Sequence, residues 1–464
     1  MISMSISHLS EVLGVTDGDV VDATFRDVTI DSRTDCEGKL FVAIRGDNFD
    51  GHKFVETAFR NGAAVALVET RLDCGIAQLV VENCKLAMGK LANYWRRHCD
   101  PCVIALTGSN GKTTVKEMLH QVLSRQAPTL ATRGNFNNDI GLPLTLFRLA
   151  PSDKFAVIEM GANHRGEIAG LAQIAEPDVV YVNNVAAAHL AGFGSIQGVI
   201  EAKGEIYAYC GPDQRALFNA DEVASGYWQE HCGAETRLSC GIDKPADVTA
   251  RWSGKGEALE IEINYRDQRQ VCTVAVIGEH NVRNVVAAIS LALLAGIDLA
   301  SAVAALEGFS GVKGRQQILS GPANSRIIDD SYNANPDSLE AGIKVLCSLP
   351  GEPWLALGDM AELGSEAVEM HREAARSALR HGVEKWFGFG EMSCLASEEF
   401  GAAGSCYQDI DSMAEAVLAQ IDQNVNLLVK GSRSAGMERL VKRLIEADDG
   451  VGHSIKPSGD THAV

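Results

Sequence analysis

The feature that most restricts the fold of this chain is a glycine-rich loop between an apolar run and an amphipathic segment. Val103–Leu106 has the composition of a short buried strand, Thr107-Gly-Ser-Asn-Gly-Lys-Thr-Thr114 follows, and Val115–Leu123 has helical periodicity. Backbone N–H groups of such a loop converge on phosphate oxygens, and the helix N-terminus adds partial positive charge. Lys112 is then placed to reach the β- and γ-phosphates of a nucleotide, and the Thr113 hydroxyl to ligate Mg²⁺.

The loop is a shortened variant of the general phosphate-binding pattern. That pattern has a glycine five residues before Gly111, where this chain has Leu106, so Gly108 makes the early turn. A chance Gly-Lys-Thr in a surface loop is the alternative, and the strand before and helix after it disfavour that reading. The residues expected to bind nucleotide are Gly108, Ser109, Asn110, Gly111, Lys112, Thr113 and Thr114.

Length, charge and cysteine content narrow the class of protein. A chain of 464 residues exceeds one ordinary core, so two or three domains are expected, and the net charge of −20 argues against a nucleic-acid partner. Met1–Ser10 lacks the pattern of a secretion signal, and Val285–Ile297 is too short to span a bilayer. We therefore expect a cytoplasmic protein without a transmembrane segment, whose 12 scattered cysteines are reduced. The C-x-x-C at Cys99–Cys102 is attributed to chance spacing.

The pattern of strands and helices divides the chain into three α/β parts and a tail. Residues 1–100 read as a small mixed α/β domain, and 101–312 as a parallel-sheet ATP-binding domain with a more β-like insert at about 236–277. After a glycine-rich junction, 313–446 show a second alternation of strands and helices. Residues 447–464 lack periodicity and are expected to be disordered.

Polar residues follow two strands that come after the loop. Phe155–Ile158 ends in Glu159 and Val179–Val182 ends in Asn183, at the sheet edge where ligands of parallel α/β sheets bind. Glu159 is placed to bind Mg²⁺ directly or through water, the alternative being an ordinary surface glutamate. His189 lies just beyond the second strand, which makes it a candidate for a second metal ligand.

Further polar residues have both structural and functional interpretations. Lys203, on a helix that starts near Ser195, reads by itself as a solvated helix lysine. Asn281 and Asn284 share a helix face, where they could cap the helix or hydrogen-bond a base. Arg315 could form a salt bridge or reach a transferring phosphate. Three strand ends of the last domain would face one cleft edge: Asp329–Pro336, Gly358–Gly364 and Lys430–Arg433.

Together these motifs resemble the Mur ligase family over about residues 31–443. The resemblance is carried by Thr107–Thr114, Gly134-Asn-Phe-Asn-Asn-Asp-Ile-Gly141, Ile158-Glu-Met-Gly161, Glu201-Ala-Lys-Gly204, His280-Asn-Val-Arg-Asn284 and Asp330-Ser-Tyr-Asn-Ala-Asn-Pro336. The Tyr-Asn-Ala-Asn-Pro element is most similar to members that add D-alanyl-D-alanine. The resemblance implies a UDP-binding domain, a central ATPase domain and a C-terminal Rossmann-like domain.

The reaction implied by the resemblance is ATP-dependent amide formation between UDP-N-acetylmuramoyl-tripeptide and D-alanyl-D-alanine through an acyl phosphate. The product would be the pentapeptide precursor of peptidoglycan, and the enzyme a monomer. Alternatives are other ligases of the family, such as the diaminopimelate- or lysine-adding enzyme and folylpolyglutamate synthase. A nucleotide-switch or motor ATPase is an alternative of another class.

The resemblance also assigns roles to individual residues. Thr113 and Glu159 would hold one Mg²⁺, and His189 and Lys203 a second, with Lys203 as an N-carboxylated lysine. Asn281 and Asn284 would lie near adenine, Asp330 at the ribose and Arg315 at the γ-phosphate. The residues expected at the UDP-muramoyl-peptide are Ser32, Arg33, Arg45, Asn135 and Asn138. The polar strand ends suggest a site for the dipeptide at Asn333, Asn335, Asp359 and Lys430.

Overall fold

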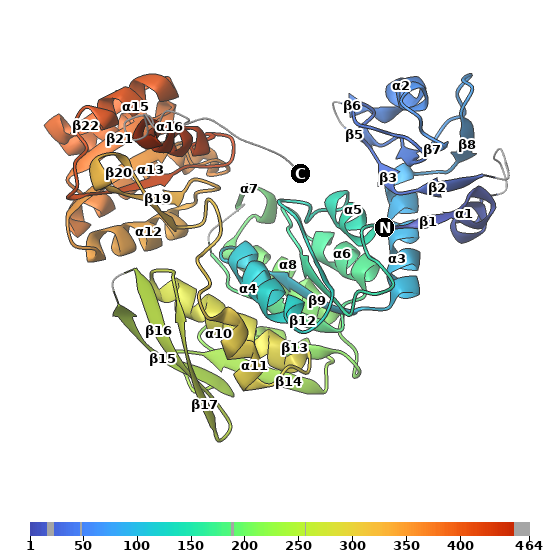
Figure 1. The fold of residues 1–464 in the computed structure, drawn as a ribbon, viewed down its shortest axis with the longest axis horizontal. Coiled ribbons are helices and arrows are strands. Elements are labelled where there is room, and N and C mark those ends of the chain that lie inside the picture. Colours follow the sequence, from blue (N-terminus) through green and yellow to red (C-terminus); the bar gives the residue numbers. More distant parts are fainter. Residues whose placement is uncertain (16–22, 47–48, 187–189, 256, 450–464) are drawn as a thin grey trace, which may run out of the picture.

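The chain folds into three α/β domains, with the central domain between the other two (Figure 1). This computed structural model describes residues 1–15, 23–46, 49–186, 190–255 and 257–449. None of the helices in these ranges is long and apolar enough to cross a bilayer.

The N-terminal domain is built on a small parallel sheet. Its strand order is β3 (Val28–Thr29), β4 (Leu40–Val42), β7 (Val65–Val68) and β8 (Ala77–Val80). The helix expected near residues 50–61 forms as a 3₁₀ turn, Gly51–Phe54, followed by α2 (Val55–Arg60). The remaining elements are β1 (Ser3–Ser5), α1 (Ile6–Leu13), β2 (Thr24–Arg26), β5 (Arg45–Gly46) and β6 (Phe49–Asp50).

Helix α3 (Cys84–Cys99) joins this domain to the central one. It begins where the Asn83 side chain accepts the N–H of Leu86, and it ends at Asp100, whose backbone is left-handed. The helix packs on α5 (Gly141–Leu146) and α6 (Glu167–Ala175) of the central domain.

The central sheet has nine strands within the described residues. Their order is β10 (Thr129–Ala131), β11 (Phe155–Glu159), β9 (Cys102–Thr107), β12 (Val179–Val182), β13 (Arg215–Asn219), β14 (Thr236–Gly241), β15 (Val248–Lys255), β16 (Ala258–Tyr265) and β17 (Gln268–Val274). Pairing is parallel from β10 to β15 and antiparallel from β15 to β17. The β-like insert therefore extends the central sheet.

Alternation along strand β9 explains why helices cover both faces of this sheet. Ile104 and Leu106 pack with α4 (Lys112–Ser124), α10 (Glu279–Leu294) and α11 (Leu299–Leu306). Val103 and Ala105 point to the opposite face, which α6 and α8 (Ile196–Ala208) cover. A strand buried on both faces needs apolar residues on both, as Val103–Leu106 of β9 supply. Two short helices, α7 (Leu190–Phe193) and α9 (Ser225–Glu230), complete the domain.

The C-terminal domain is a second doubly wound sheet. Its order is β18 (Gln317–Ser320), β19 (Arg326–Asp330), β23 (Val425–Lys430), β20 (Glu352–Gly358), β21 (Lys385–Phe389) and β22 (Gly404–Tyr407), and only β18 of these strands is antiparallel. Helices α12 (Pro336–Ser348), α13 (Ala367–His381) and α14 (Glu391–Ala396) pack with one apolar cluster. Helices α15 (Ile410–Leu418) and α16 (Glu438–Asp449) pack with the other.

Two expectations about this domain need correction. Cys394 and Cys406 form a disulfide, so the expectation that every cysteine is reduced is wrong for this pair, which the fold of α14 against β22 brings together. Helix α16 extends to Asp449, into the segment expected to be a tail from residue 447. Residues 450–464 lie outside the described residues.

Candidate active site

A cleft of about 1300 Å³ opens at the carboxyl ends of β9, β11 and β12, and all three domains contribute to its lining. The loop between β9 and α4 forms its floor. Glu159 and Lys203 come from the central domain, Arg315 and Asn335 from the C-terminal domain, and Lys90 from α3. Open α/β sheets bind ligands at this edge.

The phosphate loop is closed around its own lysine. The Nζ of Lys112 donates to the carbonyl oxygens of Gly108 at 2.7 Å and Ser109 at 3.4 Å. Burial lowers the pKa of Lys112, with a further contribution from the charge of Arg315, while the carboxylate of Glu159 opposes the shift. The ammonium therefore lies inside the loop whose backbone N–H groups would bind phosphate.

Only glycine fits at position 111. Its φ is +77°, and a Cβ there would come within 2.5 Å of the Asn183 Nδ2 and 2.6 Å of the Asn284 Oδ1. The Asn183 Nδ2 donates to the Asn110 carbonyl oxygen of the loop at 2.8 Å and to the Asn284 Oδ1 at 3.2 Å, so it links the loop to α10. The packing under Gly111 therefore fixes the shape of the loop.

Asn281 and Asn284 thus have a clear structural task. Both are buried, and Asn281 also donates to the Ile277 carbonyl oxygen at 2.8 Å. Both still line the cleft. Their proposed proximity to adenine stays a prediction.

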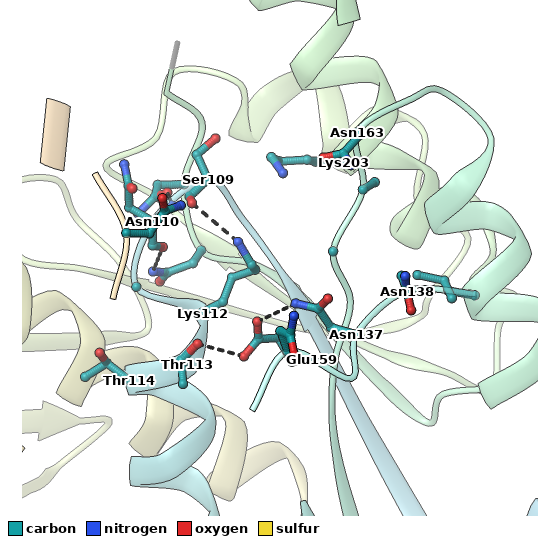
Figure 2. Close-up of a pocket in the computed structure, with 18 of the residues that line it drawn as sticks. Ser109, Asn110, Lys112, Thr113, Thr114, Asn137, Asn138, Glu159, Asn163 and Lys203 are labelled. Carbon is teal, nitrogen blue, oxygen red and sulfur yellow. Dashed lines mark hydrogen bonds between the residues drawn. The ribbon is translucent and has the colours of Figure 1, made fainter. Parts of the chain in front are cut away.

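Glu159 is the centre of a hydrogen-bonded cluster (Figure 2). The Thr113 hydroxyl donates to its Oε2 at 2.9 Å, and the Asn137 amide donates to its Oε1 at 2.8 Å. Its backbone N–H donates to the Thr132 hydroxyl at 3.0 Å. Asn137 is a partner of Glu159 that the sequence did not single out, although Asn135 and Asn138 on either side of it pointed to this loop.

The oxygens of Thr113 and Glu159 suit a hard cation such as Mg²⁺. No group of three or more His, Cys, Asp or Glu side chains in the described part of the chain could hold a metal by itself. Mg²⁺ in nucleotide sites commonly keeps several waters and binds one or two protein ligands plus phosphates, so the pair fits this ion.

Lys203 is buried, which contradicts its interpretation as a solvated helix lysine. Only 2% of it is exposed, and its Nζ lies 5.9 Å from the ring centroid of Phe193. No described carboxylate forms an ion pair with it. Burial lowers the pKa of Lys203 to about 7, and the charge of Lys112 adds to the shift. His189, its expected partner, lies outside the described residues.

Two hydrogen bonds connect the C-terminal domain to the phosphate loop. Arg315 donates from an Nη to the Thr113 hydroxyl at 3.3 Å, and Asn335 donates from Nδ2 to the Asn110 Oδ1 at 2.9 Å. The Asn335 Oδ1 also accepts the N–H of Ser338 and caps α12. The domain junction therefore lies directly over the nucleotide site.

The other residues expected at the dipeptide differ in whether their polar groups are free to contact a substrate. Asn333 is exposed and lines the cleft. Lys430 is buried and forms a 2.7 Å ion pair with Asp330, so its charge is already paired. Asp359 does not line the cleft among the described residues, because its carboxylate accepts the N–H of Ser393 at the start of α14.

The residues expected at the UDP-muramoyl-peptide fall into two groups. Asn135 and Asn138 line the cleft, and the Asn138 Oδ1 also accepts the N–H of Gly141 at 2.8 Å. Ser32, Arg33 and Arg45 do not line it, and within the described residues they belong to the N-terminal domain. Arg33 pairs with Asp31, and Arg45 with Asp50 and Glu69.

Comparisons with known proteins agree with this architecture. Three family models match: the Mur ligase family catalytic domain at residues 24–94, the Mur ligase middle domain at 106–292, and the Mur ligase glutamate ligase domain at 314–433. The UDP-N-acetylmuramoyl-tripeptide–D-alanyl-D-alanine ligase of Escherichia coli (strain K12) is 39% identical over 451 residues, which are 96% of this chain and 99% of that protein. The Bacillus subtilis (strain 168) ligase of the same name is 31% identical over 96% of this chain and 99% of its own length.

Solved structures show the same three-domain fold. MurF from Acinetobacter baumannii superposes with a TM-score of 0.89 and 34% identity, covering 96% of this chain and 99% of that one. MurF ligase from Thermotoga maritima in complex with ADP has a TM-score of 0.81 and 26% identity, covering 92% and 99%. The chain belongs to the Mur ligase family.

Proposed function

We propose that this chain is an ATP-dependent ligase that joins D-alanyl-D-alanine to UDP-N-acetylmuramoyl-tripeptide and so makes the pentapeptide precursor of peptidoglycan. The observation that carries the proposal is similarity at 39% identity over almost the full length to a ligase of that name. The cleft supplies the parts that such a reaction needs, with a phosphate loop, an acidic residue and an arginine from the next domain within contact of one another.

The reaction consists of two transfers. The terminal carboxylate of the tripeptide attacks the γ-phosphorus of ATP, which forms an acyl phosphate and releases ADP. The amine of D-alanyl-D-alanine then attacks the acyl carbon, loses a proton, and expels inorganic phosphate as the amide forms. Lys112 and Arg315 neutralise phosphate charge, and the domains bring the reactants together. Asn281 and Asn284 would lie near the adenine of ATP, and Asp330 near its ribose.

Thr113 and Glu159 would hold Mg²⁺, which when bound neutralises phosphate charge. Asn137 contributes by fixing the other oxygen of the Glu159 carboxylate. We place a second ion near Lys203, for which His189 is the other ligand carried over from the family resemblance.

We further propose that Lys203 acts as an N-carboxylated lysine. A buried amine whose pKa is about 7 is partly neutral at physiological pH, and a neutral amine can add carbon dioxide, whereas an ammonium cannot. The carbamate that forms is anionic and presents oxygens suited to Mg²⁺. This requirement explains why a lysine would be buried without a described carboxylate partner.

The test of the carbamate uses two substitutions. Lys203→Ala should lose ligation activity, and a short carboxylic acid added to the buffer should restore part of it. Lys203→Arg should stay inactive with or without that acid, because a guanidinium keeps its charge. Full activity of Lys203→Arg would rule out the carbamate.

For the dipeptide we propose the C-terminal strand ends, with Asn333 as the exposed polar contact and Asn335 and Lys430 beside it. Asp359 would contribute indirectly, by accepting the N–H groups at the start of α14. For the UDP-muramoyl-peptide we propose Asn135 and Asn138 in the cleft, with Ser32, Arg33 and Arg45 at the nucleotide end. Because the reaction consumes ATP, a cytoplasmic metabolite, we propose a cytoplasmic enzyme, and we propose that it is a monomer.

The deciding experiment is phosphate release from ATP against a panel of acceptors and donors. A D-alanyl-D-alanine ligase requires both a UDP-muramoyl-tripeptide and a D,D-dipeptide for fast turnover. Efficient addition of diaminopimelate or lysine to a UDP-muramoyl-dipeptide would identify the sister ligase instead, and folate-dependent turnover would identify folylpolyglutamate synthase. Fast hydrolysis without any acceptor would indicate a switch ATPase.

A further inference from the structure

The guanidinium of Arg315 is held by an aromatic ring where a carboxylate would be the usual partner. Its Cζ lies 4.0 Å from the ring centroid of Tyr332, well within the range of a cation–π interaction. Among the described residues no carboxylate forms an ion pair with Arg315. The Nε of Arg315 is buried without a hydrogen-bond partner, and within the described residues the guanidinium donates to the Thr113 hydroxyl.

The choice of partner matters for the chemistry at this position. A carboxylate would neutralise Arg315 and would occupy the N–H edge that phosphate oxygens need. An aromatic face attracts the guanidinium through its quadrupole, leaves the net charge intact, and uses no N–H donor. Tyr332 can therefore orient the arginine without competing for its N–H groups.

The backbone around the pair fixes the ring beside the arginine. The Tyr332 N–H donates to the Gly314 carbonyl oxygen at 3.2 Å. Gly314 has φ of +73°, and a Cβ there would come within 3.2 Å of the Tyr332 Cβ. The Gly314 N–H in turn donates to the Asp329 Oδ2 at 3.2 Å. These contacts tie the backbone next to Arg315 to the strand end that carries Tyr332.

The same ring has a second guanidinium near it. The Cζ of Arg433, from the loop after β23, lies 5.7 Å from the Tyr332 ring centroid, and this arginine also pairs with Glu438 at 3.1 Å. Both arginines line the cleft. The ring is therefore near both a residue that contacts the phosphate loop and a residue from the C-terminal strand ends.

We propose that Tyr332 is the positioning residue for Arg315, holding its guanidinium by its ring face so that the arginine stays charged and aimed at the transferring phosphoryl group. The proposal rests on the proposed function in one respect, that Arg315 contacts the γ-phosphate. It assigns the ring, and not the hydroxyl, as the part of Tyr332 that matters.

The test compares Tyr332→Leu and Tyr332→Phe in two readouts. In ligation, Tyr332→Leu should lower kcat about tenfold and change KM for ATP less than about twofold, because the held charge acts mainly as phosphate charge redistributes. Tyr332→Phe keeps the ring and should stay within about twofold of wild type in both parameters. Tyr332→Met repeats the test without a ring if the leucine variant does not fold.

The second readout does not depend on the acceptor substrate. Calorimetry of ADP with aluminium fluoride, which imitates a transferring phosphoryl group, should show binding weakened about tenfold in Tyr332→Leu, while binding of ADP alone is unchanged. This result would support the role of Tyr332 even if ligation assays pointed to another acceptor.

The control is the Arg315→Ala background. In that background Tyr332→Leu should lower kcat by less than about a further twofold, since the arginine that Tyr332 positions is already absent. An equal additional loss in that background, or a Tyr332→Phe variant as impaired as Tyr332→Leu, would overturn the proposal.

Discussion

Replacing Lys203 by methionine should change how the stability of the protein depends on pH. The amine is 2% exposed, and burial, reinforced by the charge of Lys112, lowers its pKa from the ordinary 10.5 to about 7. Between pH 7 and 10.5 the unfolded chain keeps a proton on this lysine that the folded chain has released. Stability therefore rises with pH across that window.

The magnitude follows from the size of the pKa shift. Each pH unit within the window changes the free energy of unfolding by about 1.4 kcal/mol, so the cost of burying the group at or below pH 7 is on the order of 4–5 kcal/mol. At pH 9 about 2 kcal/mol of that cost remains. The methionine side chain of Lys203→Met fills a similar volume and has no titrating group. The variant should be more stable than wild type at pH 7, and its advantage should shrink as the pH rises.

The assay is urea unfolding at several values between pH 6.5 and 9, in buffers freed of carbon dioxide so that the amine stays unmodified. Trp228 is fully buried and donates to the Ile200 carbonyl oxygen of α8 at 3.0 Å, so tryptophan fluorescence includes a reporter in contact with the helix that carries Lys203. Lys90→Met, at an exposed position on α3, is the matched control and should show no pH-dependent advantage. An advantage of Lys203→Met that stays constant from pH 7 to 9 would refute the lowered pKa.

Three further substitutions test the nucleotide site. Lys112→Ala should abolish ligation while the fold survives, as circular dichroism can verify; near-normal turnover would remove the phosphate-loop assignment. Arg315→Ala should reduce kcat more than affinity for ATP, since its contact strengthens as phosphate charge redistributes, and an effect confined to ATP affinity would contradict this. Asn137→Ala should raise the Mg²⁺ concentration needed for half-maximal activity by about tenfold, because the carboxylate that it orients loses its hydrogen bond. Asn135→Ala, in the same loop, is the control and should leave that concentration unchanged.

The glycine-rich loop with its preceding strand and following helix could be predicted from the sequence because its signals are local. A loop that binds phosphate needs glycine, lysine and threonine at fixed spacing, and strand β9 before it has to be apolar on both faces. Glu159 was placed correctly at the cleft for a related reason, since the carboxyl ends of neighbouring parallel strands meet at one edge. The overall α/β class followed from the same alternation of strands and helices.

The burial and pairing of other residues depend on segments that are distant in the sequence. Lys203 has the sequence context of a surface lysine, and only the packing of α8 against the sheet buries it. Asp359 looked like a cleft residue, but the start of α14, some thirty residues later, takes up its carboxylate.

The sequence by itself therefore determined which chemical groups lie at the ends of the strands, because strand periodicity and loop spacing are properties of adjacent residues. The tertiary structure alone decided which groups are buried, paired or free to meet a substrate. Asn137 on Glu159, Tyr332 under Arg315 and the joining of Cys394 to Cys406 all depend on contacts between segments apart in the chain. Burial and hydrogen bonding are set by such neighbours, and no local pattern encodes them.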